Sequence, residues 1–348
     1  MTAGVSAHEE DTRMFREAAE APQVVATQLE SNRALLARLG AQLRERTPRA
    51  VVTAARGSSD HVATFAKYLI ETKTGTITAS AGLSTSSVYA PRSKFEDVLF
   101  LAISQSGKSP DLIAATAEAK KAGAQTIALV NDPTSPLAEL ADDVVPLCAG
   151  AERSVAATKT YLASASAVAA LVAAWCDDGI FNQALSRLPD QLSSAWSLDW
   201  SPAVEQLKSA RDLYVIGRGL GFGAAQEAAL KFKETSALHA EAFSAAEVQH
   251  GPMALVTSDF PVLVFSQADG TRAGIETLVD KLAHADARLL LAGVNHRDAC
   301  NLPIIAADPA LEPILMIQSF YRMANALSLA RGLDPDRPSH LNKVTETV

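Results

Sequence analysis

Short, continuous apolar runs recur along the chain, each followed by turn residues and then by a segment with helical spacing. The runs lie at 50–55, 98–103 and 125–130 in the first half, and at 213–216, 261–265 and 288–294 in the second half. Fully buried strands that alternate with helices are typical of parallel sheets covered on both faces. The pattern therefore predicts an α/β protein built on doubly wound parallel sheets.

The two halves repeat one another at a constant offset. Arg56-Gly57, after the first run, recurs as Arg218-Gly219 after the fourth run. Ser104-Gln105 recurs as Ser266-Gln267, and the spacing between the two copies is the same for both pairs. Because both pairs stand in the same strand–loop–helix context, we interpret the chain as a duplication of one α/β domain.

The segments around the two predicted domains have patterns of their own. A helical arm from Met14 to Arg46, broken at Pro22, precedes the first domain, and a linker falls around 188–202. A tail that contains Pro335 and Pro338 follows the second domain. The predicted boundaries are 1–46 for the arm, 47–187 for the first domain, 203–331 for the second domain and 332–348 for the tail.

Length and charge narrow the classes of function. A chain of 348 residues agrees with two domains. Lys and Arg total 31 against 39 Asp and Glu, which gives a net charge of −8. Nucleic acids and anionic membranes are bound by basic faces, so this balance disfavours both as partners. A local basic pocket for a phosphate stays compatible with it.

The cysteines and the apolar segments favour a cytoplasmic protein. Cys148, Cys176 and Cys300 are far apart and odd in number, which fits reduced thiols better than a disulfide framework. The sequence has no CxxC or HExxH spacing, so it signals no metal site. The most apolar helical stretch, 161–175, is too short to span a bilayer and is predicted to be a buried helix.

A loop rich in hydroxyl groups, 104–109, follows the second apolar run and reads Ser-Gln-Ser-Gly-Lys-Ser. Ser109 is a natural N-cap and Pro110 a natural first helical residue, so the free N–H groups of a helix point into this loop. Such a loop suits a phosphate, but its residues also serve as ordinary turn and capping residues, and both interpretations stay open. The hydroxyl-bearing residues here and after the first run are Ser104, Ser106, Ser109, Ser58 and Ser59.

A second group of polar residues lies between 227 and 250. Lys231 and Glu234 are three residues apart on a predicted helix, so they share a face. A buried Glu beside a Lys suits a general base for a carbon acid, whereas a solvated surface pair is the more common arrangement. His250 precedes Gly251-Pro252 in a region that we interpret as turn-rich, where a proton-transfer histidine is well placed.

Two further segments leave alternatives open. Lys343 lies five residues from the chain end, where it is either solvated or folded over a pocket with its amine available to a sugar carbonyl. The repeat of the hydroxyl-rich loop, 266–270, has Asp269 where a phosphate would sit. We therefore expect only the first copy of the loop to bind a phosphate.

As an ordered set, the motifs resemble those of the SIS (sugar isomerase) family, above all the isomerase half of glucosamine-6-phosphate synthase. The resemblance covers nearly the whole chain, from the arm at Met14 to the tail at Lys343. Arg56-Gly57-Ser58-Ser59 is similar to the family's CGTS, and 104–109 is similar to SQSGET. The remaining segments are similar, in order, to E-x-x-VASTK at 152–159, GALKLKE at 228–234, HAEA at 239–242, ELKHGP at 247–252 and PRNLAK at 338–343.

The resemblance implies two tandem SIS domains of the flavodoxin-like kind and assigns roles to single residues. Glu234 would move a proton between carbons 1 and 2, and Lys231 would support it. His250 would assist ring opening from the neighbouring subunit of a homodimer, and Lys343 would meet the carbonyl from a tail that closes the active site. The residues that would bind the phosphate or the sugar are Ser58, Ser59, Ser104, Gln105, Ser106, Ser109, Val155 and Ala157.

The sequence also differs from the family's motifs at several positions, and these differences change the function that we expect. Ala157 stands where the synthase has a serine that contacts sugar, and Lys108 stands where it has an acid. No cysteine occurs before Cys148, so we expect no glutaminase domain and a reaction in the degrading direction. The resemblance then implies a cytoplasmic deaminase that converts glucosamine-6-phosphate to fructose-6-phosphate and ammonia without a cofactor. A galactosamine-6-phosphate deaminase, a fructosamine-phosphate deglycase and a sugar-phosphate sensor without turnover are the alternatives.

Overall fold

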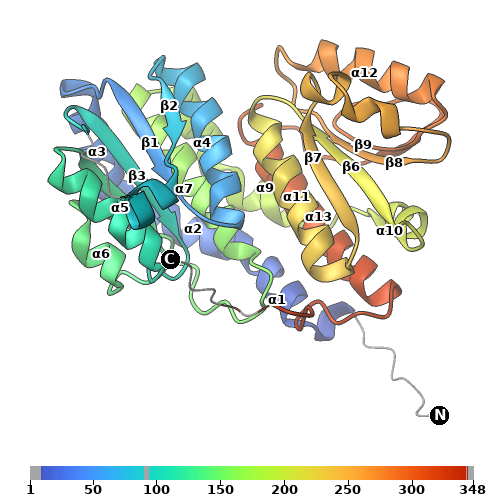
Figure 1. Cartoon of the computed structure of the whole chain (residues 1–348), viewed down its shortest axis with the longest axis horizontal. Helices are drawn as coiled ribbons and strands as arrows, with labels where there is room; N and C mark the ends of the chain where they lie inside the picture. The colour runs from blue at the N-terminus through green and yellow to red at the C-terminus, as the bar shows by residue number, and fades with distance from the viewer. Residues whose placement is uncertain (1–8, 90–93, 342, 344–348) are drawn as a thin grey trace. The chain divides into compact units, whose positions relative to one another are not determined.

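The computed structural model describes residues 9–89, 94–341 and 343. Among them the chain forms two compact units, which we treat separately. The first-sheet unit comprises Pro22–Ala151 and Thr160–Asp190. The second-sheet unit comprises the residues up to Ala21 together with Glu152–Lys159 and Gln191–Lys343. Each unit is built around one parallel sheet (Figure 1).

The first sheet has the strand order β2-β1-β3-β4-β5, and all of its strand pairs are parallel. Every residue of the central strand β3 is buried, which explains its continuous apolar sequence. The strands are β1 (Ala50–Ala54), β2 (Thr78–Ser80), β3 (Val98–Ser104), β4 (Gln125–Val130) and β5 (Asp143–Pro146).

This strand order decides where a ligand can bind. From β1 the chain passes through helix α4 (Ser58–Thr74) to β2 at one edge, and from β3 it passes through α5 (Pro110–Lys121) toward β4 and β5 at the other. The order therefore reverses between β1 and β3, and doubly wound sheets bind ligands beside the carboxyl ends of strands at such a point. The two hydroxyl-rich loops follow these two strands.

The second sheet repeats this topology. Its order is β10-β9-β8-β6-β7, again with parallel pairs, so the first two strands in sequence hold the same places as β1 and β2 in the first sheet. This confirms the predicted tandem α/β fold. The strands are β6 (Asp212–Gly217), β7 (His239–Ser244), β8 (Pro261–Phe265), β9 (Arg288–Ala292) and β10 (Cys300–Leu302).

The duplication extends to backbone detail. Helix α11 (Leu220–Ser236) begins and ends at the residues that the sequence repeat makes equivalent to the two ends of α4. The glycines before these helices have closely similar dihedral angles, with φ 54° and ψ −133° at Gly57 and φ 58° and ψ −125° at Gly219. A positive φ at this position favours glycine, so both copies keep it.

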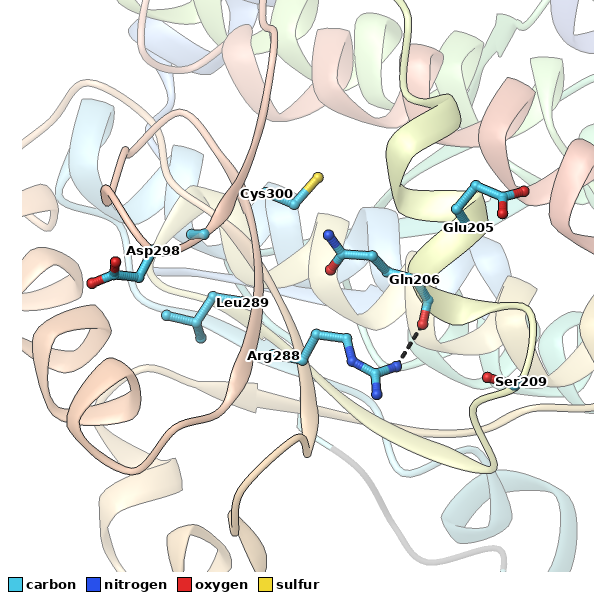
Figure 2. Close-up of a pocket in the computed structure, with 8 residues that line it drawn as sticks. Glu205, Gln206, Ser209, Arg288, Leu289, Asp298 and Cys300 are labelled. Carbon is cyan, nitrogen blue, oxygen red and sulfur yellow. Dashed lines mark hydrogen bonds between the residues drawn. The ribbon is translucent and has the colours of Figure 1, made fainter.

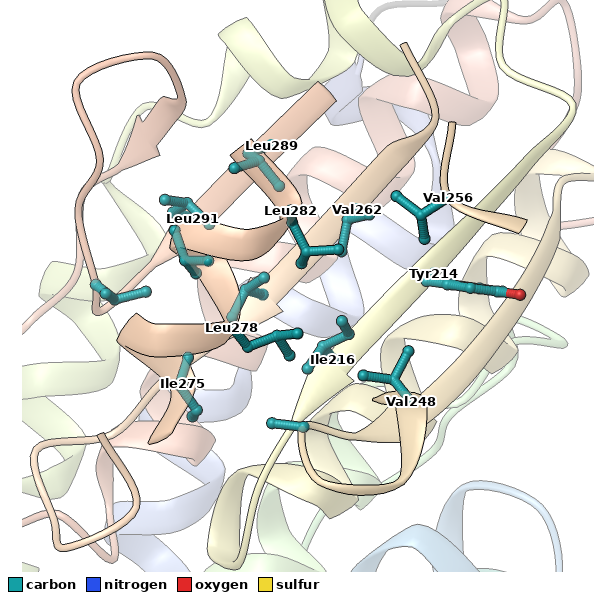
Figure 3. Packing of buried hydrophobic residues seen from close by; sticks show 14 residues of the cluster. Tyr214, Ile216, Val248, Val256, Val262, Ile275, Leu278, Leu282, Leu289 and Leu291 are labelled. Carbon is teal, nitrogen blue, oxygen red and sulfur yellow. The ribbon is translucent and has the colours of Figure 1, made fainter. Parts of the chain in front are cut away.

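The core of the second-sheet unit fills the space between the sheet and helix α12 (Arg272–His284). Ile216 and Val262 from the strands pack with Leu278 and Leu282 of this helix (Figure 3). On α11, in turn, packs the long helix α13 (Glu312–Ala330), whose residues are nearly all buried. The helix α1 (Arg13–Ala19) packs on α13.

The predicted helical arm is broken next to Pro22, as expected, and also at a second place. Helix α1 ends before Glu20, and Pro22 lies in the first turn of α2 (Ala21–Ser31), where its missing N–H costs no hydrogen bond. A second break at Asn32 separates α2 from α3 (Arg33–Glu45). The Asn32 side chain is buried there and donates to the carbonyl of Pro146, 2.8 Å away.

The predicted linker at 188–202 is also mostly helical. Pro189 lies in the first turn of α9 (Leu188–Trp196), and Pro202 lies in the first turn of α10 (Ser201–Leu207). Proline is common at this position because the first N–H groups of a helix have no intrahelical acceptor. These prolines therefore mark helix starts, which the sequence pattern did not separate from loop prolines.

The apolar stretch at 161–175 forms a buried core helix, as predicted, but the expectation that it is too short to span a bilayer is wrong. Helix α7 (Lys159–Cys176) is long and apolar enough to cross a membrane, but 89% of it is buried inside the protein. It packs so closely on α3 that a Cβ atom on Gly40 would lie 2.4 Å from the carbonyl oxygen of Ala174. The first-sheet unit also contains α6 (Pro136–Leu140), α8 (Gly179–Ser186) and a π-helical turn (Thr85–Tyr89).

We predict that Gly40→Ala destabilises the protein although alanine is the better helix former. The new methyl group meets backbone atoms, so α3 and α7 must separate, and overpacking of this kind costs about 1–3 kcal/mol. Urea denaturation measures the change in the free energy of unfolding. Gly179→Ala, also in a helix but with open space at its Cβ position, is the control and should be neutral or stabilising by up to about 1 kcal/mol. Equal stability of both variants would contradict the prediction.

Candidate functional site

The loop at 104–109 is folded on itself by hydrogen bonds to its own hydroxyl groups. Ser104 Oγ accepts from Gly107 N at 3.0 Å, and Ser106 Oγ accepts from Lys108 N at 3.3 Å. Gly107 has a φ of 62°, and a Cβ atom there would lie 2.1 Å from Ser135 Oγ, so only glycine fits. The loop thus has a fixed shape at the carboxyl end of β3.

The end of this loop resolves one ambiguity of the sequence. Ser109 is the N-cap residue of α5 and Pro110 is its first residue, but the Ser109 hydroxyl makes no capping hydrogen bond. Helix capping therefore does not account for the Ser109 hydroxyl group. The Ser109 hydroxyl and the positive dipole end of the 12-residue helix are both available to an anion at this point.

The other predicted phosphate residues lie at the same edge of the first sheet. Ser58 and Ser59 are the first two residues of α4, directly after β1, and both are partly buried. Gln105 is also partly buried, and its carbonyl accepts from Asn131 N. Because β1 and β3 are hydrogen-bonded neighbours, both loops flank the switch point of the sheet. The structure therefore brings together all of the residues that the sequence proposed for the phosphate.

A buried row of charged side chains runs along α11. The Lys231 side chain is 0% exposed, and its Nζ contacts Glu234 Oε2 and lies 3.3 Å from Glu227 Oε1. Tyr321 of α13 donates its hydroxyl hydrogen to Glu227 Oε1 at 2.9 Å. The surface-pair interpretation of Lys231 and Glu234 is therefore wrong, since the lysine lies in the core of this unit.

The two carboxylates keep Lys231 charged. Burial on its own lowers the pKa of Lys231, but Glu227 and Glu234 more than offset this effect and raise the pKa above its ordinary value. Glu227 is fully buried, whereas the Glu234 side chain is 18% exposed. Glu234 is thus the member of the row that a substrate in solvent can reach, and a fixed cation holds its carboxylate in place.

The segment 152–159 is organised by two carboxylates. Glu17 of α1 accepts from the backbone N–H groups of Arg153, at 2.5 Å, and Ser154, at 3.1 Å. Burial raises the pKa of Glu17, although these two hydrogen bonds lower it. Glu152 is buried and accepts from Thr158 N at 3.0 Å. Val155 and Ala157, the predicted sugar contacts, are partly buried within this ordered turn.

The tail is tied to the same second-sheet unit at two points. Asp336 accepts from the N–H groups of Arg13 and Met14, at 2.7 and 2.8 Å, and so caps the first turn of α1. Lys343 Nζ lies 3.2 Å from Glu152 Oε2. Lys343 is therefore paired with a buried carboxylate rather than solvated. The predicted tail positions 342 and 344–348 lie outside the described residues.

The region around His250 is turn-rich, as predicted, but it follows a strand. Residues His239–Ser244 form the edge strand β7, and a short 3-10 helix (Glu247–Gln249) follows. His250 ends this helix and is exposed. Its placement on a connecting segment agrees with the prediction, and its role as a proton-transfer residue stays a prediction.

A cavity at the other end of the second sheet is a poor candidate. It has a volume of about 660 Å³ and lies beside Arg288 and Cys300, the first residues of β9 and β10 (Figure 2). Ligands in this fold bind at the opposite, carboxyl ends of the strands. Arg288 also donates to the carboxylate of Asp259 and to the carbonyl of Gln206, so its guanidinium is already engaged.

Sequence reasoning did not assign Glu227, Tyr321, Glu152, Glu17 or Asp336 to the site. Glu227 carried a usable signal, since it stands four residues before Lys231 on the same helix face. The others have partners far away in the sequence, as Tyr321 has in Glu227 and as Glu152 has in Lys343. Such pairs depend on how α13 and the tail dock, which no local pattern records.

Comparison with known proteins agrees with this architecture. Residues 46–174 and 206–296 match the family model described as SIS domain. A glutamine–fructose-6-phosphate aminotransferase [isomerizing] from Symbiobacterium thermophilum is 34% identical over 318 residues, which cover 86% of this chain and 52% of that protein. The corresponding protein of Aeropyrum pernix is also 34% identical, over 84% of this chain and 50% of its own length. The chain thus spans about half the length of the curated relatives it matches.

Solved structures show the same fold over nearly the whole chain. A provisionally assigned phosphosugar isomerase from Silicibacter pomeroyi DSS-3 has a TM-score of 0.90 and 42% identity over 93% of this chain and 100% of its own. The C-terminal domain of glucosamine-fructose-6-phosphate aminotransferase from Francisella tularensis has a TM-score of 0.86 at 23% identity, covering 97% of this chain and 100% of its own. A glucosamine-6-phosphate deaminase from Thermotoga maritima has a TM-score of 0.77 at 21% identity with the same coverage. The last two show likeness of fold alone.

We predict that Lys231→Met destabilises the protein by about 3–5 kcal/mol, because it leaves the buried Glu227 without its cation. Urea denaturation of the variant and the wild type measures the loss. Since the folded-state pKa of Lys231 is raised above 10.5, its contribution is present at neutral pH and is lost only as the pH rises through that higher value.

The control is Lys208→Met. Lys208 pairs with Glu205 at the same spacing of three residues, but with 49% and 69% of the two side chains exposed. An exposed pair of this kind contributes less than about 1 kcal/mol. If both variants lost the same stability, the buried row would not have the energetic role that we assign to it.

Proposed function

Because this chain belongs to the SIS domain family, we propose that it is an amino-sugar phosphate deaminase. Its reaction would convert glucosamine-6-phosphate and water to fructose-6-phosphate and ammonia. The observation that carries the proposal is the buried Lys231, which holds Glu234 at the edge of solvent as a fixed carboxylate. Proton abstraction beside a carbonyl needs a base held in this manner.

The proposed steps balance with water as the only added reactant. The sugar ring opens with help from His250, and Glu234 removes the proton from carbon 2. The resulting enolamine takes a proton at carbon 1 from the protonated Glu234, which leaves an imine at carbon 2. Water adds to the imine carbon and ammonia leaves, so that the ketone of fructose-6-phosphate remains. These steps require a base, an acid and water.

Phosphate binding is assigned to the hydroxyl-rich loops. Ser104, Ser106 and Ser109, with Gln105 and the serines at the start of α4, supply small hydroxyl and amide donors beside the positive dipole end of α5. A sugar phosphate would be held there by hydrogen bonds from neutral groups and the helix dipole. The Lys343 amine, now paired with Glu152, would meet the open-chain carbonyl.

The comparisons support this choice of substrate in two respects. The relatives named glutamine–fructose-6-phosphate aminotransferase act on the sugar phosphate that is the product of the proposed reaction. A glucosamine-6-phosphate deaminase has the same fold over the whole of its chain, so the fold is compatible with this reaction. The proposal also includes a cytoplasmic homodimer that shares His250 across its interface.

The test is the release of ammonia and fructose-6-phosphate from glucosamine-6-phosphate by the purified protein, with both products assayed separately. We expect equal amounts of the two products. Release from galactosamine-6-phosphate or a fructosamine phosphate instead would overturn the assigned substrate. Binding of these sugar phosphates without turnover of any of them would overturn the enzymatic function and favour a sensor.

We predict that Glu234→Gln lowers kcat by about 10²–10⁴-fold, the usual contribution of a general base. KM should change little, because the amide keeps the shape of the side chain. Steady-state kinetics of the variant measures both constants. Glu205→Gln, the same substitution in an exposed Lys–Glu pair, is the control and should keep wild-type kinetics. Full activity in the Glu234 variant would exclude it as the base.

A further inference from the structure

Arg56 is clamped beside the hydroxyl-rich loop by a buried carboxylate. It follows β1 by two residues, and its side chain is 52% exposed. Its Nε and Nη2 atoms donate to Asp111 Oδ2 at 2.9 and 2.7 Å. Asp111 is the second residue of α5, two positions after Ser109, so the guanidinium lies at the first turn of this helix.

The position of Asp111 calls for a cation. Its side chain is 0% exposed, and its Oδ1 atom accepts from Leu112 N at 2.8 Å. A buried negative charge one turn from a phosphate would repel it strongly if it were unpaired. Arg56 removes this repulsion, and because both of its bonds go to one carboxylate oxygen on the buried side, its exposed part is free to face an anion.

In the second copy the carboxylate lies within the loop itself. Arg218 is the equivalent of Arg56 in the sequence repeat, but Ala273 replaces Asp111, so this arginine has no such clamp. Instead Asp269 replaces Gly107, and its carboxylate accepts from Gln267 Nε2 and from Thr271 N, both at 2.8 Å. The hydrogen-bond donors of the second loop are therefore bound by the loop's own carboxylate.

We propose that Arg56 is a phosphate ligand of the first loop and that Asp111 is the positioning residue that aims it. This rests on the proposed function, since it adds a charged ligand to the neutral donors assigned there. Arginine suits the role because its planar guanidinium can bind one anion on each side. With its carboxylate on α5 rather than inside the loop, the first copy has no negative charge of the loop itself that would compete with a phosphate.

The test compares Arg56→Ala with Arg218→Ala, its equivalent in the closed loop. Isothermal titration of each variant with fructose-6-phosphate, and separately with inorganic phosphate, gives the Kd values. We expect Arg56→Ala to weaken both by about tenfold or more, the usual loss for a charge-assisted hydrogen bond. Arg218→Ala should bind both as the wild type does. Equal Kd values for the two variants would overturn the proposal.

Asp111→Asn shows whether Asp111 positions Arg56 or acts only through its own charge, because the two roles change the affinity for phosphate in opposite directions. Removal of a negative charge near the loop should strengthen phosphate binding if Asp111 acts through its charge alone. If it aims Arg56, the loss of the clamp should weaken binding, and the thermal midpoint should stay near that of the wild type. Stronger binding in this variant would overturn the positioning role.

The outcomes also separate this inference from the proposed function. If the wild type binds fructose-6-phosphate and releases ammonia while Arg56→Ala is unaltered, the role of Arg56 is wrong and the function stands. If the wild type binds fructose-6-phosphate and inorganic phosphate and loses both with Arg56→Ala, but releases no ammonia from any amino-sugar phosphate, the role of Arg56 stands and the function is wrong.

Discussion

A lysine that is fully buried between two carboxylates is the constraint on which the second-sheet unit depends. Lys231 can stay charged in the core only because Glu227 and Glu234 flank it. Glu227 needs Tyr321 as a further donor, and Tyr321 reaches it only because α13 packs along α11. The chain thus uses one carboxylate to hold the lysine and leaves the other at the edge of solvent. Because the burial of charged side chains has a large desolvation penalty, such an arrangement is typical of a functional site.

Duplication gave the chain two copies of one strand–loop–helix unit, and the copies have diverged in their carboxylates. In the first copy the loop itself has no carboxylate, while Asp111 follows it on α5 and holds Arg56. In the second copy Asp269 occupies the loop from within. The backbone before each helix is nearly unchanged, so the difference between an open and a filled anion site lies in a few side chains.

The central strands and the tandem repeat could be predicted from the sequence because a strand buried on both faces, such as β3, is a continuous apolar run. The edge strands β2 and β10 could not, since each has three residues and an exposed position. The loop that suits a phosphate was visible in local spacing. The ion pair of Arg56 with Asp111 beside this loop was not visible, because the two residues are 55 positions apart in the sequence. Only the pairing of β1 with β3 brings them together.

The central claim is that Glu234, fixed by Lys231, moves a proton between two carbons. The most direct measurement is the turnover of glucosamine-6-phosphate in D₂O, with the position of deuterium in the product read by NMR. Since the Glu234 side chain is partly exposed, its proton can exchange with solvent between removal and return. The account predicts deuterium at carbon 1 of fructose-6-phosphate. A product formed at the same rate with no deuterium at that carbon would contradict it.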